Sequence, residues 1–243
     1  MRTDFQQIIA SPVTAYQEGL RFFMGEGILN ETLRRVTKDL ENHQIDYSVI
    51  GAVALNQHGY RRFTEDIDLL LTRDGLQKFR NELIGRGYRP AFEGATKKFR
   101  TTEENVTVEI ITSGEFPGDG KEKPVQFPNP NENQIEIDGV KTLTLEKLIE
   151  LKLASGMTAP HRLKDLADVQ ELVKVKNLTA AYAEKLIELK LASGITAPHR
   201  LKDLADVQEL VKVKNLTADF ADKLNPFVRG KFLELQKAVE DSE

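Results

Sequence analysis

The pattern of hydrophobic and polar positions divides the chain into a first part of mixed periodicity and a second part of helical periodicity. In the first part, short apolar runs and alternating stretches predict strands, while apolar residues three and four positions apart predict helices. From residue 144 onward, only the helical spacing occurs. We therefore predict an α+β fold, with a mixed-sheet domain and N-terminal helices over residues 1–143 and a helical domain over residues 144–243.

The predicted sheet contains two single strands and two hairpins. An apolar strand covers residues 47–50, and an acidic strand begins at Asp66. A hairpin is predicted over residues 97–112 because a short polar connection separates two alternating stretches. The segment 113–133 is rich in Gly, Pro and Asn and should be an irregular loop. A tighter hairpin follows over residues 135–143, with an Asp-Gly turn.

Helices are predicted on both sides of these strands. Residues 1–27 should contain one or two helices, and Asn30 is the predicted N-cap of a helix over residues 31–43. The sequence Arg-Asp-Gly at residues 73–75 indicates a break in regular structure. We therefore expect the next amphipathic helix over residues 76–86.

The helical part contains a near-identical internal repeat. Residues 146–183 recur at 184–221 with a period of 38 residues, and over most of the unit the one change is Met157 to Ile195. That period suits a helical pair, with a solenoid as the alternative. Because even surface positions are retained, we interpret the repeat as a recent or engineered duplication. A free copy would expose a leucine-rich face, so we expect it to pack on its twin or to drive self-association.

Composition excludes several classes of protein and site. With 40% hydrophobic and 30% charged residues in 243, the chain is typical of a globular protein. The absence of cysteine excludes disulfides and thiolate metal sites, and no two of the four histidines are spaced as zinc ligands on a helix. A net charge of −4 argues against general nucleic-acid binding. The N-terminus has no long apolar core, so we expect no signal peptide, no membrane span and a cytoplasmic location.

The strongest candidate chemistry is the pair of acids at Asp66 and Asp68. Because side chains alternate along a strand, both carboxylates lie on one face, with Ile67 pointing to the other. Their mutual repulsion is relieved by a cation, and oxygen ligands suit Mg²⁺. The alternative is an ordinary solvent-exposed strand face.

A strand-to-helix turn of small residues lies upstream of these acids. Gly51 and Ala52 follow one apolar strand and precede a helix-compatible run, and such turns let backbone N–H groups approach an anion closely. A phosphate-binding turn a short distance before a metal-binding pair of aspartates on a strand is a recurrent arrangement.

At these residues the chain resembles nucleotidyltransferases of the DNA polymerase β type, and most closely the small bacterial group that includes the AbiEii toxins. Members of that group share a pattern of the form GGxAL…HGxxRxTxDID. The residues that match this pattern are Gly51, Ala52, Val53, Ala54, Leu55, His58, Gly59, Arg62, Thr64, Asp66, Ile67 and Asp68. The departure is Ala52, which stands where the family has Gly or Ser and removes a hydroxyl group and some backbone freedom.

A third acid is expected on a later strand in the family, and Glu109 occupies that place here. It is a single acid in an otherwise apolar strand. Two interpretations are open: a solvent-facing glutamate, or a third carboxylate that meets Asp66 and Asp68 across the sheet. The family usually has Asp at this position.

The helical part carries a second set of candidate residues. The first helix of the repeat should begin after Thr144 and end at Gly156, and it places Lys152 within its apolar stripe. The ammonium of this lysine either extends to solvent from the contact between two helices or reaches the triphosphate of a bound nucleotide. Family members place a lysine before an R-x-K-D-x-x-D helix and use it in catalysis, which implies roles for Lys152, Asp165 and Asp168. The duplicate set is Lys190, Asp203 and Asp206.

The resemblance implies Mg²⁺-dependent nucleotidyl transfer. Asp66 and Asp68 would hold Mg²⁺, with Glu109 as the third candidate ligand. Glu109 or Asp165 would act as a metal ligand or general base, and Asp168 is a further candidate catalytic residue. The nucleotide would be bound by the residues Gly51, Ala52, Arg62, Thr64 and Lys152. Arg62 has the alternative of a salt bridge to Glu65 or Asp66.

The implied partners are a nucleoside triphosphate and an acceptor that is a tRNA end, a protein side chain or a small molecule. An antitoxin protein is a further candidate partner. Two other functions stay open at this point. Ala52 and Glu109 suggest a nucleotide-binding module that has lost catalysis, and the 38-residue period suggests a helical scaffold.

Overall fold

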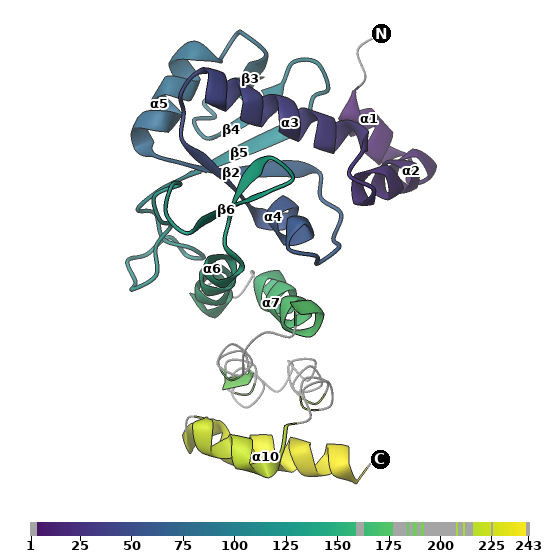
Figure 1. Cartoon of the computed structure of the whole chain (residues 1–243), viewed down its shortest axis with the longest axis vertical. Helices are drawn as coiled ribbons and strands as arrows, with labels where there is room; N and C mark the ends of the chain where they lie inside the picture. Colours follow the sequence, from purple (N-terminus) through teal and green to yellow (C-terminus); the bar gives the residue numbers. More distant parts are fainter. Residues whose placement is uncertain are drawn as a thin grey trace. The chain divides into compact units, whose positions relative to one another are not determined.

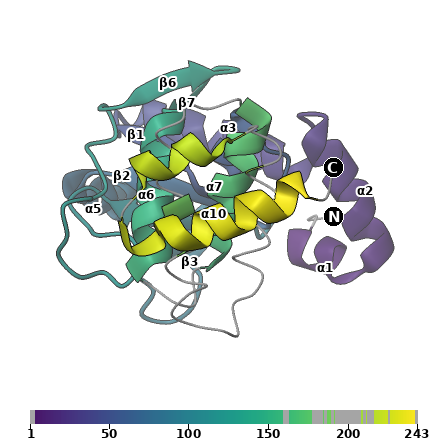
Figure 2. The same ribbon diagram turned by 90° about the horizontal axis from the view of Figure 1, so that it is seen from below.

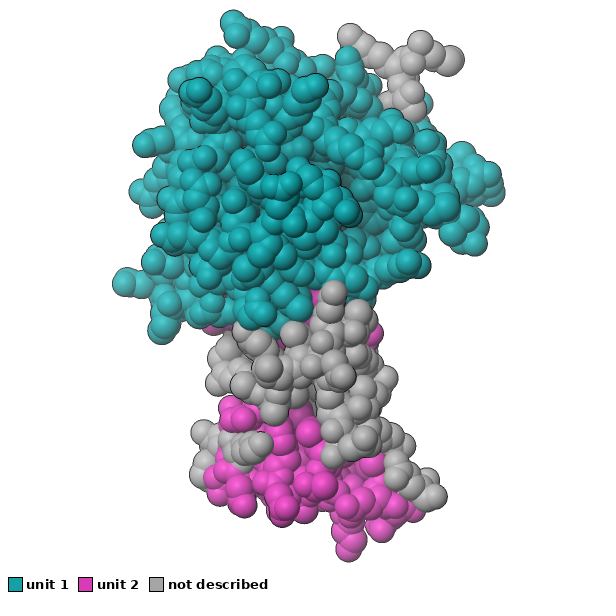
Figure 3. All heavy atoms as spheres, in the orientation of Figure 1, with its two compact units in different colours: residues 1–151 teal, residues 152–243 magenta. Residues whose placement is uncertain are grey.

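The computed structural model of the chain describes residues 4–158, 163–176, 216–224 and 226–241 (Figure 1). It also describes six isolated residues, which are 184, 187, 188, 191, 208 and 211. The chain divides into two compact units, Met1–Leu151 and Lys152–Glu243, which are coloured separately in Figure 3. Most of the second repeat copy lies outside the described residues, so the structure of the duplication and the domain boundary after residue 143 stay predictions.

The first unit is organised around a mixed sheet. Within the described residues, this sheet has seven strands in the order β3-β4-β5-β2-β1-β7-β6. The strands are β1 Tyr47–Ile50, β2 Asp66–Leu71, β3 Tyr88–Pro90, β4 Lys98–Thr101, β5 Thr107–Thr112, β6 Gln134–Ile137 and β7 Val140–Leu143. The central strand β2 pairs parallel with β5 and antiparallel with β1, while β1 pairs parallel with β7. The predicted mixed sheet is therefore confirmed.

Both predicted hairpins are present. Strands β4 and β5 pair antiparallel, and so do β6 and β7. In the second turn, Asp138 and Gly139 both have positive φ angles, 52° and 76°, as a tight two-residue hairpin turn requires. The loop over residues 113–133 has no helix or strand, as its composition predicts. Strand β3 was not predicted, because two of its three residues are exposed and one of these is proline.

Five helices of the first unit surround the sheet. They are α1 Phe5–Ala10, α2 Pro12–Phe23, α3 Gly27–Asn42, α4 Gly51–Gln57 and α5 Arg73–Glu82. Helices α1 and α2 form a pair to one side of the sheet (Figures 1 and 2). Helix α5 places Phe79 against the rings of Tyr88 and Phe99, and α3 accepts a hydrogen bond from the hydroxyl of Tyr88 through Asp39. Both α3 and α5 therefore cover the sheet face that carries Tyr88 and Phe99.

The predicted start of α3 was wrong. The helix begins at Gly27, and Asn30 lies inside it, where its amide donates to the carbonyls of Phe22 (3.0 Å) and Glu26 (2.7 Å). The free N–H of Ile28 is satisfied at 2.5 Å by the carboxylate of the buried Glu18, which belongs to α2. This cap comes from another helix, so local sequence rules could not identify it.

The predicted break at residues 73–75 was also wrong, because these residues are the first turn of α5. The hydroxyl oxygen of Thr72 accepts a hydrogen bond from the backbone N–H of Gly75 at 2.9 Å and so caps the helix. A Cβ at Gly75 would lie 3.3 Å from the side chain of Ile45, so the small residue permits close packing rather than a break. The helix ends at Glu82, four residues earlier than predicted, and Gly85 follows with a positive φ of 83°.

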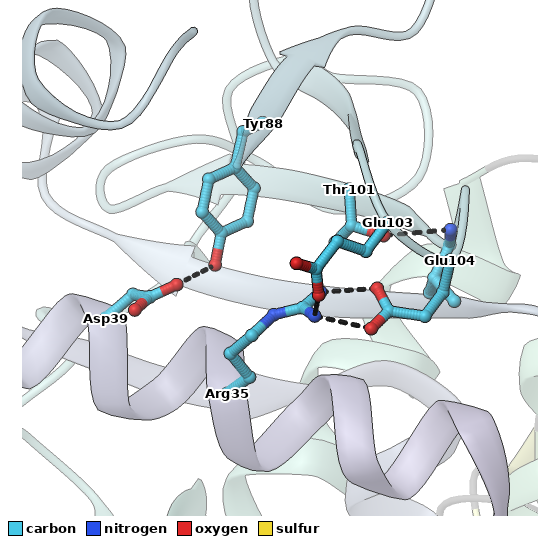
Figure 4. Close-up of polar contacts among 7 residues, drawn as sticks. Arg35, Asp39, Tyr88, Thr101, Glu103 and Glu104 are labelled. Carbon is cyan, nitrogen blue, oxygen red and sulfur yellow. Dashed lines mark hydrogen bonds and ion pairs between the residues drawn. The ribbon is translucent and has the colours of Figure 1, made fainter. Parts of the chain in front are cut away.

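An ion-pair cluster fastens α3 to the turn between β4 and β5 (Figure 4). The guanidinium of Arg35 contacts Glu103 at 2.7 Å and forms two hydrogen bonds with the carboxylate of Glu104. Beside this pair, the hydroxyl of Tyr88 donates to Asp39 at 2.7 Å. Burial and this hydrogen bond raise the pKa of Tyr88, and it therefore stays a neutral donor. The cluster holds the edge strands against α3.

We expect Arg35→Met to lower the free energy of unfolding at pH 7 by about 1 kcal/mol. Burial alone would raise the pKa of Glu104, but the hydrogen bond and charge of Arg35 outweigh burial and lower it. The stabilisation is therefore fully present above about pH 5 and is lost as the pH falls below about 4. Urea unfolding of both proteins from pH 7 to 3.5 measures this, with Arg80→Met on α5 as the control. A difference that does not shrink at low pH would contradict the assignment.

The second unit is helical. Its described helices are α7 Leu163–Lys176, α10 Pro226–Glu240 and the 3-10 helix η2 Ala218–Lys223, and it begins within α6 Leu145–Thr158. Helix α6 starts after Thr144 as predicted, with the Thr144 hydroxyl accepting from the N–H of Lys147 at 3.4 Å. It does not end at Gly156, because that glycine is packed against Leu166 of α7. A Cβ there would lie 2.6 Å from the Leu166 side chain.

None of the helices formed by the described residues is both long enough and apolar enough to cross a membrane.

Candidate active site

Three carboxylates converge on one face of the sheet, opposite to the face that carries Tyr88 and Phe99. Asp66 and Asp68 share one face of β2, and Glu109 on β5 lies directly opposite Asp68 in parallel register. Each of the three offers an oxygen, and these oxygens lie within 4.8 Å of one another. The structure therefore brings Glu109 to the two aspartates, in line with the second of its two interpretations.

Short polar contacts position the first of these acids. Thr64 is buried, and its hydroxyl donates to the Oδ1 of Asp66 at 2.5 Å. The segment before Thr64 is held by Asn56, whose amide donates to the carbonyls of Ala52 (3.0 Å) and Arg62 (2.5 Å) and accepts from the N–H of Arg62 (3.1 Å). The connection from α4 to β2 is thus tied to the helix it leaves.

Asn56 is a residue that sequence reasoning missed. The signal for it was a pair of amide side chains, Asn56 and Gln57, after an apolar run and before the matched His58. His58 itself is buried, and its Nε2 lies 2.8 Å from the carbonyl oxygen of Leu143 at the end of β7. His58 therefore ties the end of α4 to β7, and Asn56 ties α4 to the connection that leads into β2.

Gly51 lies directly against Asp68. Its φ is +65°, and a Cβ at this position would collide with the Asp68 carboxylate and lie 2.8 Å from its Cγ. Glycine is therefore required twice, once for the backbone angle and once for space. The neighbouring Ala52 is buried at the start of α4.

We expect Gly51→Ala to displace the Asp68 carboxylate, because the added methyl group and the carboxylate cannot occupy the same space. The free energy of unfolding should fall by about 2 kcal/mol, and any activity that requires Asp68 should fall at least about a hundredfold. Gly85→Ala is the matched control, since Gly85 has a φ of +83° but no atom within 4 Å of a new Cβ. Equal losses in both variants, measured by urea unfolding and by the transfer assay below, would contradict this.

A lysine balances the third carboxylate. Lys98 on β4 is in register with Glu109, and its Nζ lies 3.3 Å from Glu109 Oε2. Both side chains are about two-fifths exposed, so solvent screens the pair and it contributes little to stability. Glu109 can therefore exchange this partner for another cation at small cost.

The donor set fits a divalent metal ion. The three groups supply carboxylate oxygens only, which are the ligands that Mg²⁺ prefers, and their closeness leaves negative charge that a cation would neutralise. Among the residues that the structure describes, this is the one cluster of three or more acids or histidines with such spacing. The geometry is compatible with the Mg²⁺ site expected from the sequence.

The second unit contains the other predicted cluster. The ammonium of Lys152 donates to Asp165 Oδ1 at 2.9 Å and to Asp168 Oδ2 at 2.7 Å, and the hydroxyl of Ser155 donates to Asp165 Oδ2 at 2.6 Å. Asp168 is 2% exposed. The structure thus joins the lysine to both acids, and Ser155 is a fourth member that the sequence did not indicate.

The remaining predicted site residues belong to the segment before β2 or to the second repeat copy. Thr64 and the backbone of Arg62 belong to the segment that leads into β2, as described above. The duplicate set Lys190, Asp203 and Asp206 lies outside the described residues.

Comparisons with known proteins identify what this arrangement is similar to. A family profile described as "Nucleotidyl transferase AbiEii toxin, Type IV TA system" matches residues 38–241. This range contains both carboxylate clusters. The comparison with curated proteins gave no match.

The solved structures that resemble the chain include one described as a nucleotidyltransferase, a complex of ANT(2″)-Ia and a nucleotidyltransferase-like protein. One from Thermotoga maritima has 18% identity and a TM-score of 0.40, covering 56% of this chain and 89% of that one. ANT(2″)-Ia in complex with adenylyl-2″-tobramycin has 14% identity and a TM-score of 0.43, covering 64% and 92%. An antigenic nucleotidyltransferase-like protein from Paracoccidioides brasiliensis has 15% identity and a TM-score of 0.43, covering 72% and 91%.

Proposed function

The chain belongs to the AbiEii family of nucleotidyl transferase toxins, and we propose that it transfers a nucleoside monophosphate from a nucleoside triphosphate to an acceptor hydroxyl group. The family establishes nucleotidyl transfer in general. The metal ion, the acceptor and the residues that act are parts of the proposal. A tRNA end, a protein side chain and a small molecule are the candidate acceptors.

The observation that carries the proposal is the convergence of Asp66, Asp68 and Glu109 on one sheet face. A triphosphate brings several negative charges, so three carboxylates alone would repel it. A divalent cation held by them would offset most of that charge and would stabilise the negative charge that builds on the leaving pyrophosphate. We propose Mg²⁺ for this position because the ligands are all carboxylate oxygens.

The proposed reaction is a displacement at the α-phosphorus. The acceptor oxygen attacks the α-phosphorus, and the bond from the α-phosphorus to the oxygen bridging to the β-phosphorus breaks, so that pyrophosphate leaves. The proton of the acceptor hydroxyl passes to a carboxylate, for which Glu109 is our candidate in the first unit. Thr64 keeps the Asp66 carboxylate oriented through its hydrogen bond. Gly51, Ala52 and Arg62 are proposed to contact the phosphates, as in the family pattern.

The Lys152 cluster is proposed to serve the same reaction. The family uses a lysine and an acid of the following helix in catalysis, and here Lys152, Asp165 and Asp168 form one hydrogen-bonded group. An ammonium that is already oriented by two carboxylates is a suitable phosphate ligand, because little further ordering is needed. This role rests on the family pattern and on the contacts within the second unit.

The family description also names a toxin of a type IV toxin–antitoxin system. We propose that this chain acts as the toxin of such a pair, with an antitoxin protein that opposes its effect. Self-association through the repeated helices is a separate proposal, which rests on the leucine-rich face of the repeat.

The proposed function is tested by offering each of the four α-labelled nucleoside triphosphates with Mg²⁺ to the protein. Total tRNA, the protein itself and a cell extract serve as acceptors in parallel reactions. We expect label transfer from at least one nucleotide, and its loss when EDTA replaces Mg²⁺. If no combination gives transfer while nucleotide still binds, the chain is a binding module and not an enzyme.

A further inference from the structure

Two arginines lie directly opposite one another on the sheet face that carries the three acids. Arg89 on β3 is in register with Arg100 on β4 (the strands are labelled in Figure 1). Paired side chains on adjacent strands point to the same face, with Cβ atoms about 5 Å apart, and like charges at such positions are destabilising. Folding alone therefore does not favour this pair.

Both guanidinium groups converge on one neutral oxygen. Nη2 of Arg89 and Nη1 of Arg100 donate to Oδ1 of Asn105, at 2.8 and 3.3 Å. The amide nitrogen of Asn105 donates to Asp4 at 3.1 Å, which turns the amide oxygen toward the arginines. Within the described part of the chain, neither arginine forms an ion pair with a carboxylate. Arg89 is exposed and Arg100 half-buried, so a ligand from solvent can reach the pair.

The arginine pair shares its sheet face with the three acids. Arg100 is in register with Thr107, which is in register with Asp66, so all three side chains point to the same side. At about 4.8 Å between strands, Arg100 and Arg89 lie roughly 10 and 14 Å across the sheet from Asp66. Lys98 lies two residues before Arg100 on the same face of β4, and its ammonium contacts Glu109. Three cations on β4 and β3 therefore share this face with the acid cluster.

We propose that Arg89 and Arg100 form a binding site for a phosphate group of a substrate of the transfer reaction. This rests on the proposed function, which supplies substrates that carry phosphate. Arginine forks match phosphate oxygens, and one phosphate between the two guanidinium groups relieves their repulsion. The phosphate belongs either to the nucleotide or to the backbone of a polynucleotide acceptor, and the same two residues serve both.

Two probes separate these sources. The first is a fluorescein-labelled single-stranded RNA dodecamer, followed by anisotropy in EDTA so that no metal ion contributes. The second is a fluorescent ATP analogue titrated in Mg²⁺. We expect the double variant Arg89→Ala/Arg100→Ala to weaken the binding of at least one probe about tenfold or more. Weaker binding of the RNA assigns the site to the phosphates of a polynucleotide. Weaker binding of the ATP analogue assigns it to the phosphates of the nucleotide.

The matched control removes two exposed arginines from the opposite side of the sheet. Arg73→Ala/Arg80→Ala changes the net charge equally, but both residues belong to α5, and we expect less than a twofold effect. The proposal is overturned if neither probe binds the wild-type protein, or if both bind the two double variants equally well. A lower urea midpoint for Arg89→Ala/Arg100→Ala with unchanged probe binding would likewise overturn it, by assigning the pair to folding.

Failure of the proposed function is distinguishable from failure of this site. Asp68→Asn should abolish transfer and leave RNA binding in EDTA unchanged. If the wild-type protein transfers no nucleotide but the arginine variant still loses probe binding, the phosphate site stands and the reaction does not. If transfer occurs and the arginine variant binds both probes normally, the proposed reaction stands and the phosphate site does not.

Discussion

Asp68→Asn is expected to reduce nucleotidyl transfer at least about a thousandfold. Asp68 is the acid that has both Gly51 and Glu109 as neighbours, so it lies at the centre of the proposed metal site. Replacing its charge with a neutral amide weakens the hold on a divalent cation, and a loss of about 4 kcal/mol of transition-state stabilisation corresponds to three powers of ten. Transfer rates with saturating Mg²⁺ and nucleotide measure this directly.

Metal-dependent stability provides a second measurement on the same variant. A ligand that binds the folded state raises its stability, by about 2.7 kcal/mol when the ligand is at a hundred times its Kd. Mg²⁺ should therefore raise the Tm of the wild-type protein and not that of Asp68→Asn. Asp74→Asn, an exposed acid on α5, is the matched control and should behave as wild type. An Asp68→Asn protein that keeps its activity would contradict the proposed metal site.

Lys152→Met is expected to lower the free energy of unfolding of the second unit by about 3 kcal/mol or more. The substitution keeps an apolar chain of similar length but takes the ammonium away from Asp165 and from Asp168, which is 2% exposed. Removing one partner of a buried ion pair leaves a buried charge poorly compensated and typically costs 3–5 kcal/mol. Transfer should fall as well, because the phosphate ligand that the family pattern assigns is gone.

The control for this prediction lies on the same helix. Lys147 pairs with Glu150 at 2.7 Å, but Glu150 is 45% exposed, so Lys147→Met should cost less than about 1 kcal/mol. Lys152→Arg keeps the charge and should restore part of the stability. Urea unfolding and transfer per folded molecule separate the two effects. Loss of transfer in Lys152→Arg at nearly normal stability would favour a catalytic role, and full transfer in Lys152→Met would exclude it.

The acid cluster could be predicted from the sequence because strand periodicity alone decides which side chains share a face. Asp66 and Asp68 had to lie together, and Glu109 had to lie on one of two faces of its own strand. What the pattern could not provide was the register between β2 and β5, which places Glu109 opposite Asp68. That register depends on contacts between segments about forty residues apart, so the sequence alone could not place Glu109 beside the two aspartates.

The missed features share a different cause. The start of α3 depends on Glu18 from another helix, and the continuation of α6 through Gly156 depends on packing against Leu166. At both positions a local sequence rule predicted a helix terminus. A contact with a residue distant in the sequence accompanies the different terminus that the structure shows. The arginine pair was missed for the same reason, since strand β3 was not predicted and Arg89 could not be placed beside Arg100.

The central claim is tested most directly by comparing two labels in the same reaction. With nucleotide labelled at the α-phosphate, the account predicts that label becomes attached to the acceptor. With label at the γ-phosphate, it predicts that all label leaves as pyrophosphate, and Asp68→Asn should show neither result. Attachment of the γ-label to the acceptor would show phosphoryl transfer instead, and would contradict nucleotidyl transfer at the Asp66, Asp68 and Glu109 cluster.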